Sequence, residues 1–148
     1  MAKIKDKKIG FTLLELILVV ALISITSAIV APVYFSAKSA DDLDNSANAL
    51  ASSLRKAQLL SMAVEGDSSW GVKLINENVV IFKGADYLSR DSAWDEIFKV
   101  NKNIKNSGLD EVVFSKLYGQ PNLNGDIYLT DGNKNKILNI NSLGVIEY

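Results

Sequence analysis

The sequence contains neither histidine nor cysteine, and these two absences exclude several kinds of chemistry. Without cysteine there is no disulfide framework and no thiolate nucleophile, and without histidine the commonest general base is missing. A zinc site would have to use carboxylates alone, whereas zinc prefers nitrogen and sulfur ligands. The acid pairs Asp41-Asp42 and Asp95-Glu96 are the remaining candidates for acid–base work, and a solvated helix face or loop is the simpler interpretation of both. We therefore expect a protein that is not an enzyme and that binds no cofactor or metal.

The sequence also lacks a large excess of either charge. Its 148 residues include 16 Lys+Arg and 17 Asp+Glu, for a formal net charge of −1. This balance divides into a basic segment, residues 1–10 with four lysines and one aspartate, and an acidic remainder, residues 11–148 with 12 basic and 16 acidic residues. Binding to nucleic acid would require a basic surface, so nucleic acid is not an expected partner.

The apolar residues, 48% of the chain, are concentrated near the N-terminus. Within residues 11–31, 16 of 21 residues are apolar. As a helix, 21 residues at ~1.5 Å each span ~31 Å, which is the thickness of a bilayer's hydrocarbon core. Lysines before the run favour a cytoplasmic N-terminus. We predict a transmembrane helix over 11–31 with the rest of the chain on the outer side.

Two alternatives to a transmembrane helix are considered. A buried core helix fits poorly because the run has no polar face. A secretory signal peptide would have a shorter apolar region of roughly 7–15 residues before its cleavage site, although Thr26-Ser27-Ala28 resembles a weak site of this kind.

Glu15 is the one charged residue in the apolar run. A carboxylate at the centre of a bilayer costs ~2.5–3.5 kcal/mol on insertion scales, and less near the interface. An acid in this position is therefore a candidate functional residue with a partner of opposite charge. The simpler alternative is that its side chain extends to the interface.

The residues around position 10 carry a resemblance. Lys7-Lys8-Ile9-Gly10, followed by Phe11 and, four residues later, Glu15, resembles the leader junction of type IV pilins and type II secretion pseudopilins. The resemblance implies that a prepilin peptidase cuts after Gly10 and N-methylates Phe11 as the new terminus. Residues 1–10 would then be a cleaved leader. Pro32 resembles the helix-kinking proline of this family.

The same resemblance gives Glu15 a role in assembly. It implies that Glu15 pairs with the new terminal amine of Phe11 in a neighbouring chain and so sets the register of a filament. An amine and a carboxylate attract strongly at low dielectric, although desolvation reduces the net gain. The two groups are four residues apart, so pairing within one helix is also open. Gly10 suits the cleavage point because a glycine backbone is accessible and flexible.

Beyond the apolar run, the sequence predicts a second helical stretch and then strands. Pro32 disfavours helix at the preceding residue, so we expect a kink there. Residues 32–65 form the amphipathic half of the helix, which ends near Gly66. One apolar face recurs at spacings of three and four: Leu43, Ala47, Leu50, Leu54, Ala57, Ser61 and Val64. Residues 66–148 form an antiparallel β region.

In this β region, 70–75 and 79–83 predict a hairpin, and 84–96 is expected to be a loop. Further strands are expected at 97–104, 112–117, 126–130, 136–141 and 145–148. Trp70 and Trp94 are interpreted as core anchors of a small sheet. The fold class is α+β, with a long N-terminal helix whose second half packs on an antiparallel sheet.

This region resembles the GspH/FimT group of minor pseudopilins. The resemblance lies in Ser69-Trp70-Gly71-Val72, in the Tyr87, Asp91 and Trp94 loop, in the Gly-containing stretch before 126–129, and in Ile140-Asn141 with Gly144. It implies a structural minor pilin or pseudopilin of a type IV pilus or type II secretion system. The implied partners are prepilin peptidase, other pilins or pseudopilins, the inner membrane and secreted cargo.

The alternative function is a DNA-binding minor pilin of the natural transformation machinery. Some members of the group end in a basic segment after the last glycine, whereas Val145-Ile146-Glu147-Tyr148 is apolar and acidic. This difference counts against binding to DNA.

One short motif has the spacing of a calcium loop. Asp131, Asn133 and Asn135 present oxygen ligands at i, i+2 and i+4, but the twelfth position, where glutamate is required, is Ser142. Because Asp, Gly and Asn are ordinary turn residues, we predict a hairpin turn here.

Overall fold

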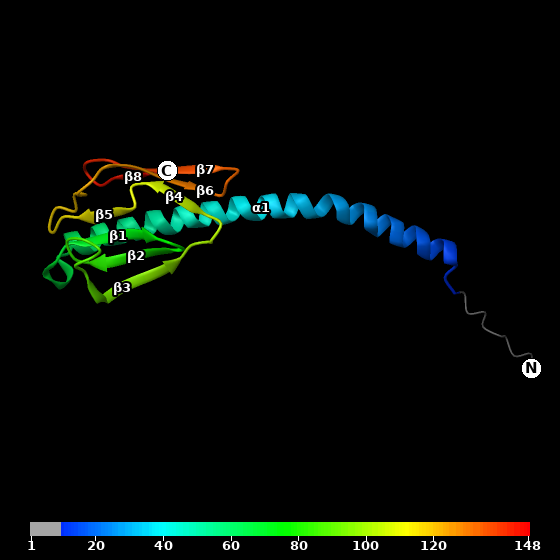
Figure 1. The fold of residues 1–148 in the computed structure, drawn as a ribbon, viewed down its shortest axis with the longest axis horizontal. Helices are drawn as coiled ribbons and strands as arrows, with labels where there is room; N and C mark the ends of the chain where they lie inside the picture. The colour runs from blue at the N-terminus through cyan, green and yellow to red at the C-terminus, as the bar shows by residue number, and fades with distance from the viewer. Residues whose placement is uncertain (1–9) are drawn as a thin grey trace, which may run out of the picture. The chain divides into compact units, whose positions relative to one another are not determined.

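The computed structural model describes residues 10–148, without the side chains of 29–33 and 35–37. The predicted leader, residues 1–10, thus lies outside the described residues except for Gly10. The chain divides into two compact units, Met1–Ala37 and Lys38–Tyr148, called here the N-terminal unit and the C-terminal unit. One helix, α1 (Leu13–Met62), contributes to both (Figure 1).

In the N-terminal unit, α1 begins at Leu13 and continues through Pro32 without interruption. The Pro32 side chain is not described, and the kink at this residue stays a prediction. The hydroxyl groups of the apolar run bond to their own helix: Ser24 Oγ donates to the Val20 carbonyl at 2.8 Å, and Thr26 Oγ1 to the Leu22 carbonyl at 3.0 Å.

Among the residues that the structure describes, none of the helices has the length and apolar character needed to cross a membrane.

In the C-terminal unit, the predicted apolar face of α1 is confirmed. Six of its seven members are buried, and Val64 is half-buried: the buried residues are Leu43, Ala47, Leu50, Leu54, Ala57 and Ser61. The helix ends at Met62, close to the predicted end, and a 3₁₀ turn, η1 (Glu65–Asp67), follows. Gly66 lies in this turn at φ 60°, a left-handed conformation that glycine adopts without a steric cost.

The β region forms two antiparallel four-stranded sheets, where one sheet was predicted. The first sheet has the order β3-β2-β1-β5 and the second β4-β6-β7-β8. The first contains β1 (Trp70–Ile75), β2 (Asn78–Lys83), β3 (Asp91–Lys99) and β5 (Glu111–Phe114). The second contains β4 (Lys105–Gly108), β6 (Gly125–Thr130), β7 (Asn135–Ile140) and β8 (Ile146–Glu147). The α+β fold class is confirmed.

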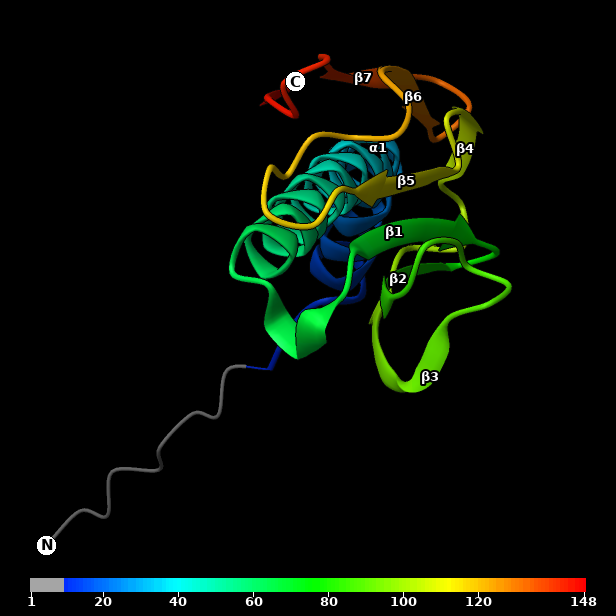
Figure 2. The same cartoon turned by 90° about the vertical axis from the view of Figure 1, so that its left-hand side faces the viewer.

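The two sheets are joined where β4 passes into β5. Only Leu109 and Asp110 separate these strands, so one extended segment supplies an edge strand to each sheet. Figure 2 shows the result: β1 and β2 lie on one side of α1, and β6 and β7 lie on another. Strand alternation then directs one face of each sheet toward the helix, giving a core with Val72, Ile81 and Phe114 from the first sheet and Ile127, Leu138 and Ile140 from the second.

The opposite face of the first sheet carries a second, smaller group of buried side chains. Val80, Phe82 and Val113 are buried there. Tyr87, from the loop between β2 and β3, meets Phe82 edge to face at 5.6 Å between ring centroids. This loop therefore covers the face of the sheet that α1 does not.

Several predicted boundaries are wrong. The predicted loop 84–96 contains the first two thirds of β3, and the predicted strand 97–104 ends at Lys99. The predicted strand 112–117 ends at Phe114, and β4 was not predicted. Trp70 is a core residue at 2% exposure, but Trp94 is 43% exposed. Trp94 lies on edge strand β3, where its ring meets Trp70 edge to face at 6.1 Å between centroids, so it covers the core from outside.

The hairpins are predicted well. The predicted strands 70–75, 79–83, 126–130 and 136–141 agree with β1, β2, β6 and β7 to within one residue at each end, and the last predicted strand is confirmed in part as β8.

Candidate processing and assembly site

Gly10 and Phe11 form the predicted cleavage junction, and both are exposed. A Cβ atom built on Gly10 would meet no atom within 4 Å. Phe11 is 84% exposed. The described part of the chain therefore leaves the bond between these residues open to an enzyme.

Thr12 caps the helix immediately after this junction. Its Oγ1 accepts the Glu15 N–H at 3.2 Å, and its carbonyl accepts the Leu16 N–H at 3.1 Å. Thr-x-x-Glu is the capping-box spacing, which satisfies N–H groups that have no partner inside the helix. This spacing is visible in the sequence, but it is not among the features predicted above. Because the cap lies on the C-terminal side of Gly10, the first turn of α1 does not depend on the leader.

Glu15 lies in the first turn of α1, where the helix dipole favours a negative charge. Its backbone N–H is bonded to Thr12. The ion pairs among the described residues all lie in the C-terminal unit, so the described part of the chain supplies no cation to the Glu15 carboxylate. Phe11 lies just before α1 and Glu15 lies in its first turn, and no ion pair joins the two in the described part of the chain.

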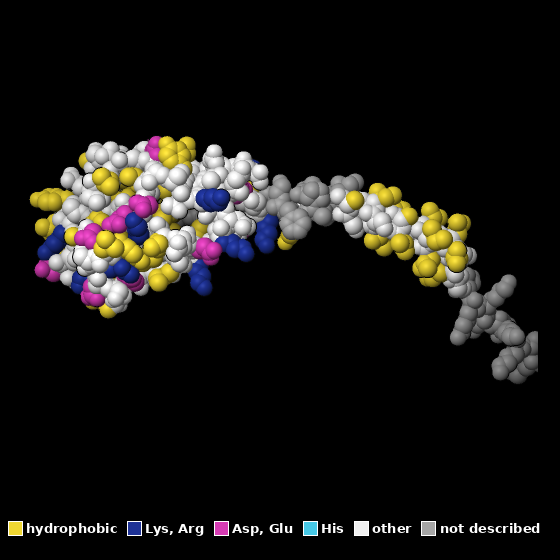
Figure 3. Space-filling model, in the orientation of Figure 1, with side chains coloured by type: hydrophobic (Ala, Val, Ile, Leu, Met, Phe, Trp, Pro, Cys, Tyr) yellow, Lys and Arg dark blue, Asp and Glu magenta, His cyan; other side chains and the backbone are white. Residues whose placement is uncertain are grey.

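The helix around Glu15 exposes apolar side chains in every direction. From Leu13 to Ile25 the large apolar residues are each about half exposed or more. Figure 3 shows these side chains as a yellow surface along this part of α1. Contiguous apolar surface of this extent marks contact with a membrane or another protein. The internal bonds of Ser24 and Thr26 suit an apolar environment because their hydroxyl groups need no water there.

The calcium-like motif is the turn between β6 and β7, as predicted. Asp131 Oδ1 accepts the N–H groups of Asn133 at 2.8 Å and Lys134 at 2.6 Å. Its Oδ2 accepts the Ser39 hydroxyl at 2.6 Å, and this bond, with the backbone N–H groups, lowers the pKa of Asp131 to about 2. Oδ1 thus holds the turn together, and Oδ2 connects it to α1. The described residues contain no group of three or more acids placed to hold a metal.

Three of the four acids in the two acid pairs have structural partners. Asp42 accepts the Asn101 side-chain amide at 2.9 Å. Asp95 pairs with Arg90 at 2.9 Å, and Glu96 pairs with Lys56 at 2.5 Å. These contacts connect β3 and its flanking loops to the rest of the C-terminal unit.

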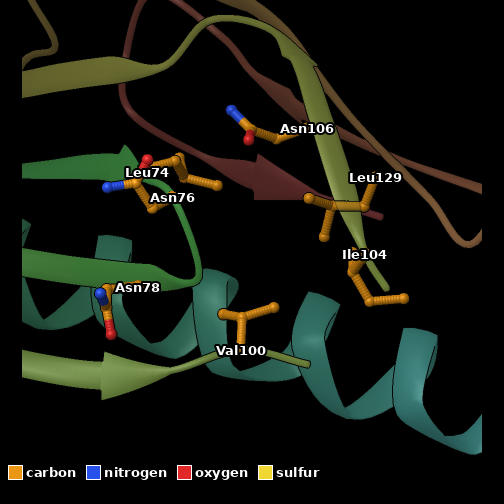
Figure 4. A pocket seen from close by; sticks show the side chains of 7 residues that line it. All are labelled: Leu74, Asn76, Asn78, Val100, Ile104, Asn106 and Leu129. Atoms are coloured by element: carbon orange, nitrogen blue, oxygen red, sulfur yellow. The ribbon is translucent and has the colours of Figure 1, made fainter. Parts of the chain in front are cut away.

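A small cavity lies between the two sheets. It is lined by seven side chains from β1, β2, β4, β6 and their connections, all labelled in Figure 4, and its volume is about 10 Å³. A volume of this size holds about one water molecule, so it is not a substrate site.

The comparison with protein families gives one finding. Residues 5–31 match the prokaryotic N-terminal methylation motif. Neither the curated proteins nor the solved structures that were compared with the chain gave a match. The matched residues include Gly10, Phe11, Thr12 and Glu15, so the chain carries a type IV pilin-like leader. The motif indicates a membrane-anchored, pilin-like protein that prepilin peptidase processes, and it is typical of structural subunits.

Proposed function

We propose that the chain is a structural minor pilin or pseudopilin subunit of a type IV pilus or a type II secretion system. Prepilin peptidase cuts after Gly10 and methylates the new terminus, Phe11. The observation that carries this proposal is the methylation motif at residues 5–31. The exposed junction at Gly10 and the α+β layout, with one long helix leading into antiparallel sheets, support it.

In this proposal the helix over 11–31 anchors the subunit in the inner membrane as a single pass. The lysines before it keep the N-terminus in the cytoplasm, and the C-terminal unit lies outside. The exposed apolar side chains between Leu13 and Ile25 supply the surface that lipid covers before assembly and that neighbouring helices cover afterwards.

Glu15 directs assembly by pairing with the terminal amine of Phe11 on a neighbouring subunit. Two features support this role. Cleavage creates a cation at the start of an apolar helix, and the Glu15 carboxylate has no cationic partner among the described residues. In an apolar environment, an amine and a carboxylate are each costly alone and far less so together.

Within the pilin-like proteins, the GspH/FimT minor pseudopilins are the proposed subgroup. The segment Ser69-Trp70-Gly71-Val72 supports this assignment, because it forms the start of β1 and places Trp70 in the core.

The DNA-binding alternative is less well supported. The C-terminal residue Tyr148 packs on α1, where its hydroxyl donates to Asn48 Oδ1 at 2.9 Å and its ring lies 5.7 Å from the Arg55 guanidinium.

The test is processing of the full chain by a co-expressed prepilin peptidase, followed by the size of the product. Wild type should lose ten residues, and Gly10→Val should stay uncut. A Cβ at Gly10 meets no neighbouring atom, so the substitution should not disturb folding. Loss of cleavage would then mean that the peptidase no longer recognises the junction. Thr12→Ser, which keeps the capping hydroxyl, is the matched control and should be cut. Equal cutting of wild type and Gly10→Val would contradict the proposal.

A further inference from the structure

The cationic side chains of the C-terminal unit fall into two groups. All residues of this unit are described, and it contains 12 Lys and Arg residues. Seven of them form an ion pair or lie over an aromatic ring: Arg55, Lys56, Lys73, Lys83, Arg90, Lys116 and Lys136. The other five have neither kind of partner in the described structure: Lys38, Lys99, Lys102, Lys105 and Lys134.

The five unpartnered lysines lie at one end of the unit, which we call the lysine end. Lys38 is the first residue of the unit. The next residue, Ser39, bonds to Asp131 in the β6–β7 turn that contains Lys134. Lys105, the first residue of β4, pairs with Thr130 at the start of the same turn.

The remaining two lysines join this end through a different contact. Asn101 bonds to Asp42 of α1 at 2.9 Å, and Lys99 and Lys102 flank Asn101 in the sequence. Figure 3 shows Lys and Arg side chains gathered at this end of the unit. The β3–β4 segment, the β6–β7 turn and the part of α1 where the unit begins thus present free ammonium groups together.

Most acids near the lysine end are already engaged. Asp44 pairs with Lys136 at 3.0 Å, Asp42 accepts from Asn101, and Asp131 accepts from Ser39 and its own turn. The carboxylates of Asp41 and Glu77, also at this end, have no ion-pair partner in the described part of the chain. The segment between Glu96 and Asp110 contains three lysines and no acid. The lysine end is therefore locally basic within an acidic unit.

We propose that the lysine end binds the anionic headgroups of the bilayer in which the subunit is anchored. This inference rests on the proposed function, because it requires the membrane anchor over 11–31. Seven residues lead from the end of that anchor to Lys38, and even a fully extended chain of this length spans at most ~25 Å. The anchor thus holds Lys38 within this distance of its own end, whatever the angle between the two units.

The chemistry of the lysine end fits a headgroup layer. Lysines beside an anionic leaflet are attracted to it within about one Debye length, ~8–10 Å. Ile97 and Phe98, which precede Lys99, are 61% and 39% exposed, and apolar side chains beside basic ones are typical of interfacial contacts. A nucleic acid would be attracted by the same charges. The membrane anchor, however, holds the bilayer close to the lysine end, and nothing in the described part of the chain holds a nucleic acid there.

The test uses the full chain, which has no native cysteine, in vesicles of zwitterionic lipid alone or with 30% phosphatidylglycerol. A fluorophore on Asn103→Cys, in the loop between β3 and β4, is quenched by nitroxide groups on the lipid headgroups. Asn124→Cys precedes β6 at the opposite end of that strand from the β6–β7 turn, and serves as the control. A third label at Ser24→Cys with acyl-chain quenchers reports the membrane anchor separately.

We expect quenching at position 103, and not at 124, to increase with phosphatidylglycerol and to fall in 0.5 M NaCl. Neutralising Lys99, Lys102 and Lys105 to Gln should weaken the contact roughly 100-fold, whereas the matching triple Arg variant should retain it. Quenching at position 103 that does not change with the anionic lipid content would overturn the inference. Lysine-dependent binding of duplex DNA, with no change of quenching on adding anionic lipid, would also overturn it. Absence of quenching at 24 would instead contradict the proposed function.

Discussion

Ser61 is the polar member of the buried face of α1, and its replacement by alanine gives the sharpest test of the packing described above. Its hydroxyl is fully buried. Ser61 Oγ accepts the Trp70 N–H at 2.8 Å and donates to the Phe114 carbonyl at 3.0 Å. One hydroxyl group therefore connects the end of α1 to the start of β1 and the end of β5.

The cost of Ser61→Ala follows from these two bonds. The Trp70 N–H and the Phe114 carbonyl each lose a partner, and a buried polar group left unsatisfied costs about 1–3 kcal/mol. We expect a loss of about 2 kcal/mol in the free energy of unfolding. Ser53→Ala is the matched control. Ser53 is also buried, but its hydroxyl donates at 2.8 Å to the Ala49 carbonyl of its own helix, so its removal leaves no donor without a partner.

The assay is urea unfolding of the full chain in detergent, followed by tryptophan fluorescence. Trp70 reports on this site because its backbone N–H is bonded to Ser61 and its ring is buried in the core. Domains of this size lose about 1–3 kcal/mol of stability per molar urea, so the Ser61→Ala midpoint should fall by about 1 M while Ser53→Ala stays within ~0.3 M of wild type. Equal midpoints for the two variants would refute the reasoning.

Three further predictions address assembly and the surface loops. Glu15→Val should abolish incorporation into filaments while leaving membrane insertion intact. Glu15→Gln should behave in the same way, because it removes the same charge. The amount of subunit in sheared filaments and in the membrane fraction measures incorporation and insertion, and normal incorporation of either variant would count against the pairing. Arg90→Ala leaves the half-buried Asp95 without its cation and removes the bond to the Tyr87 carbonyl at 2.8 Å. We therefore expect a loss of about 2 kcal/mol and faster proteolysis within 84–90, whereas unchanged proteolysis would show that Arg90 does not fix this loop. The pKa of Asp131 is lowered from 3.8 to about 2, so the stability that its carboxylate contributes is present above pH ~4 and is lost as the pH falls toward 2. Asp131→Asn should flatten that part of the plot of unfolding free energy against pH. An unchanged plot would contradict the role of its bond to Ser39.

Residue spacing along the sequence predicted the apolar face of α1 and the β-hairpins, because each depends on residues that are close in the sequence. The apolar face from Leu43 to Ser61 follows from helical spacing alone, and the hairpin of β6 and β7 follows from alternation around the turn at Asp131. The fold class was reached in the same way, whereas the junction at Gly10 was taken from the resemblance to the pilin leader. The Thr12 cap was also visible, because Thr-x-x-Glu is a spacing that marks a helix start.

The division into two sheets is a long-range outcome that local patterns do not contain. Strand β4 reads Lys-Asn-Ser-Gly, which has low β propensity, and it forms because β6 pairs with it. Gly108, at φ 85°, permits the passage into β5, and a Cβ there would lie 2.3 Å from the Asp126 carbonyl oxygen. Trp94 was misplaced for a related reason. Its strand lies at the sheet edge with an irregular register opposite Ile81 and Lys83, which its sequence does not reveal.

The central claim is that this chain is cut after Gly10 and begins, when mature, at a methylated Phe11. Mass spectrometry of the protein purified from its native membrane tests it most directly. The account predicts an N-terminal peptide that starts at Phe11, carries one added methyl group, and contains Glu15. A chain that retains Met1, or one that begins after Ala28, would contradict it.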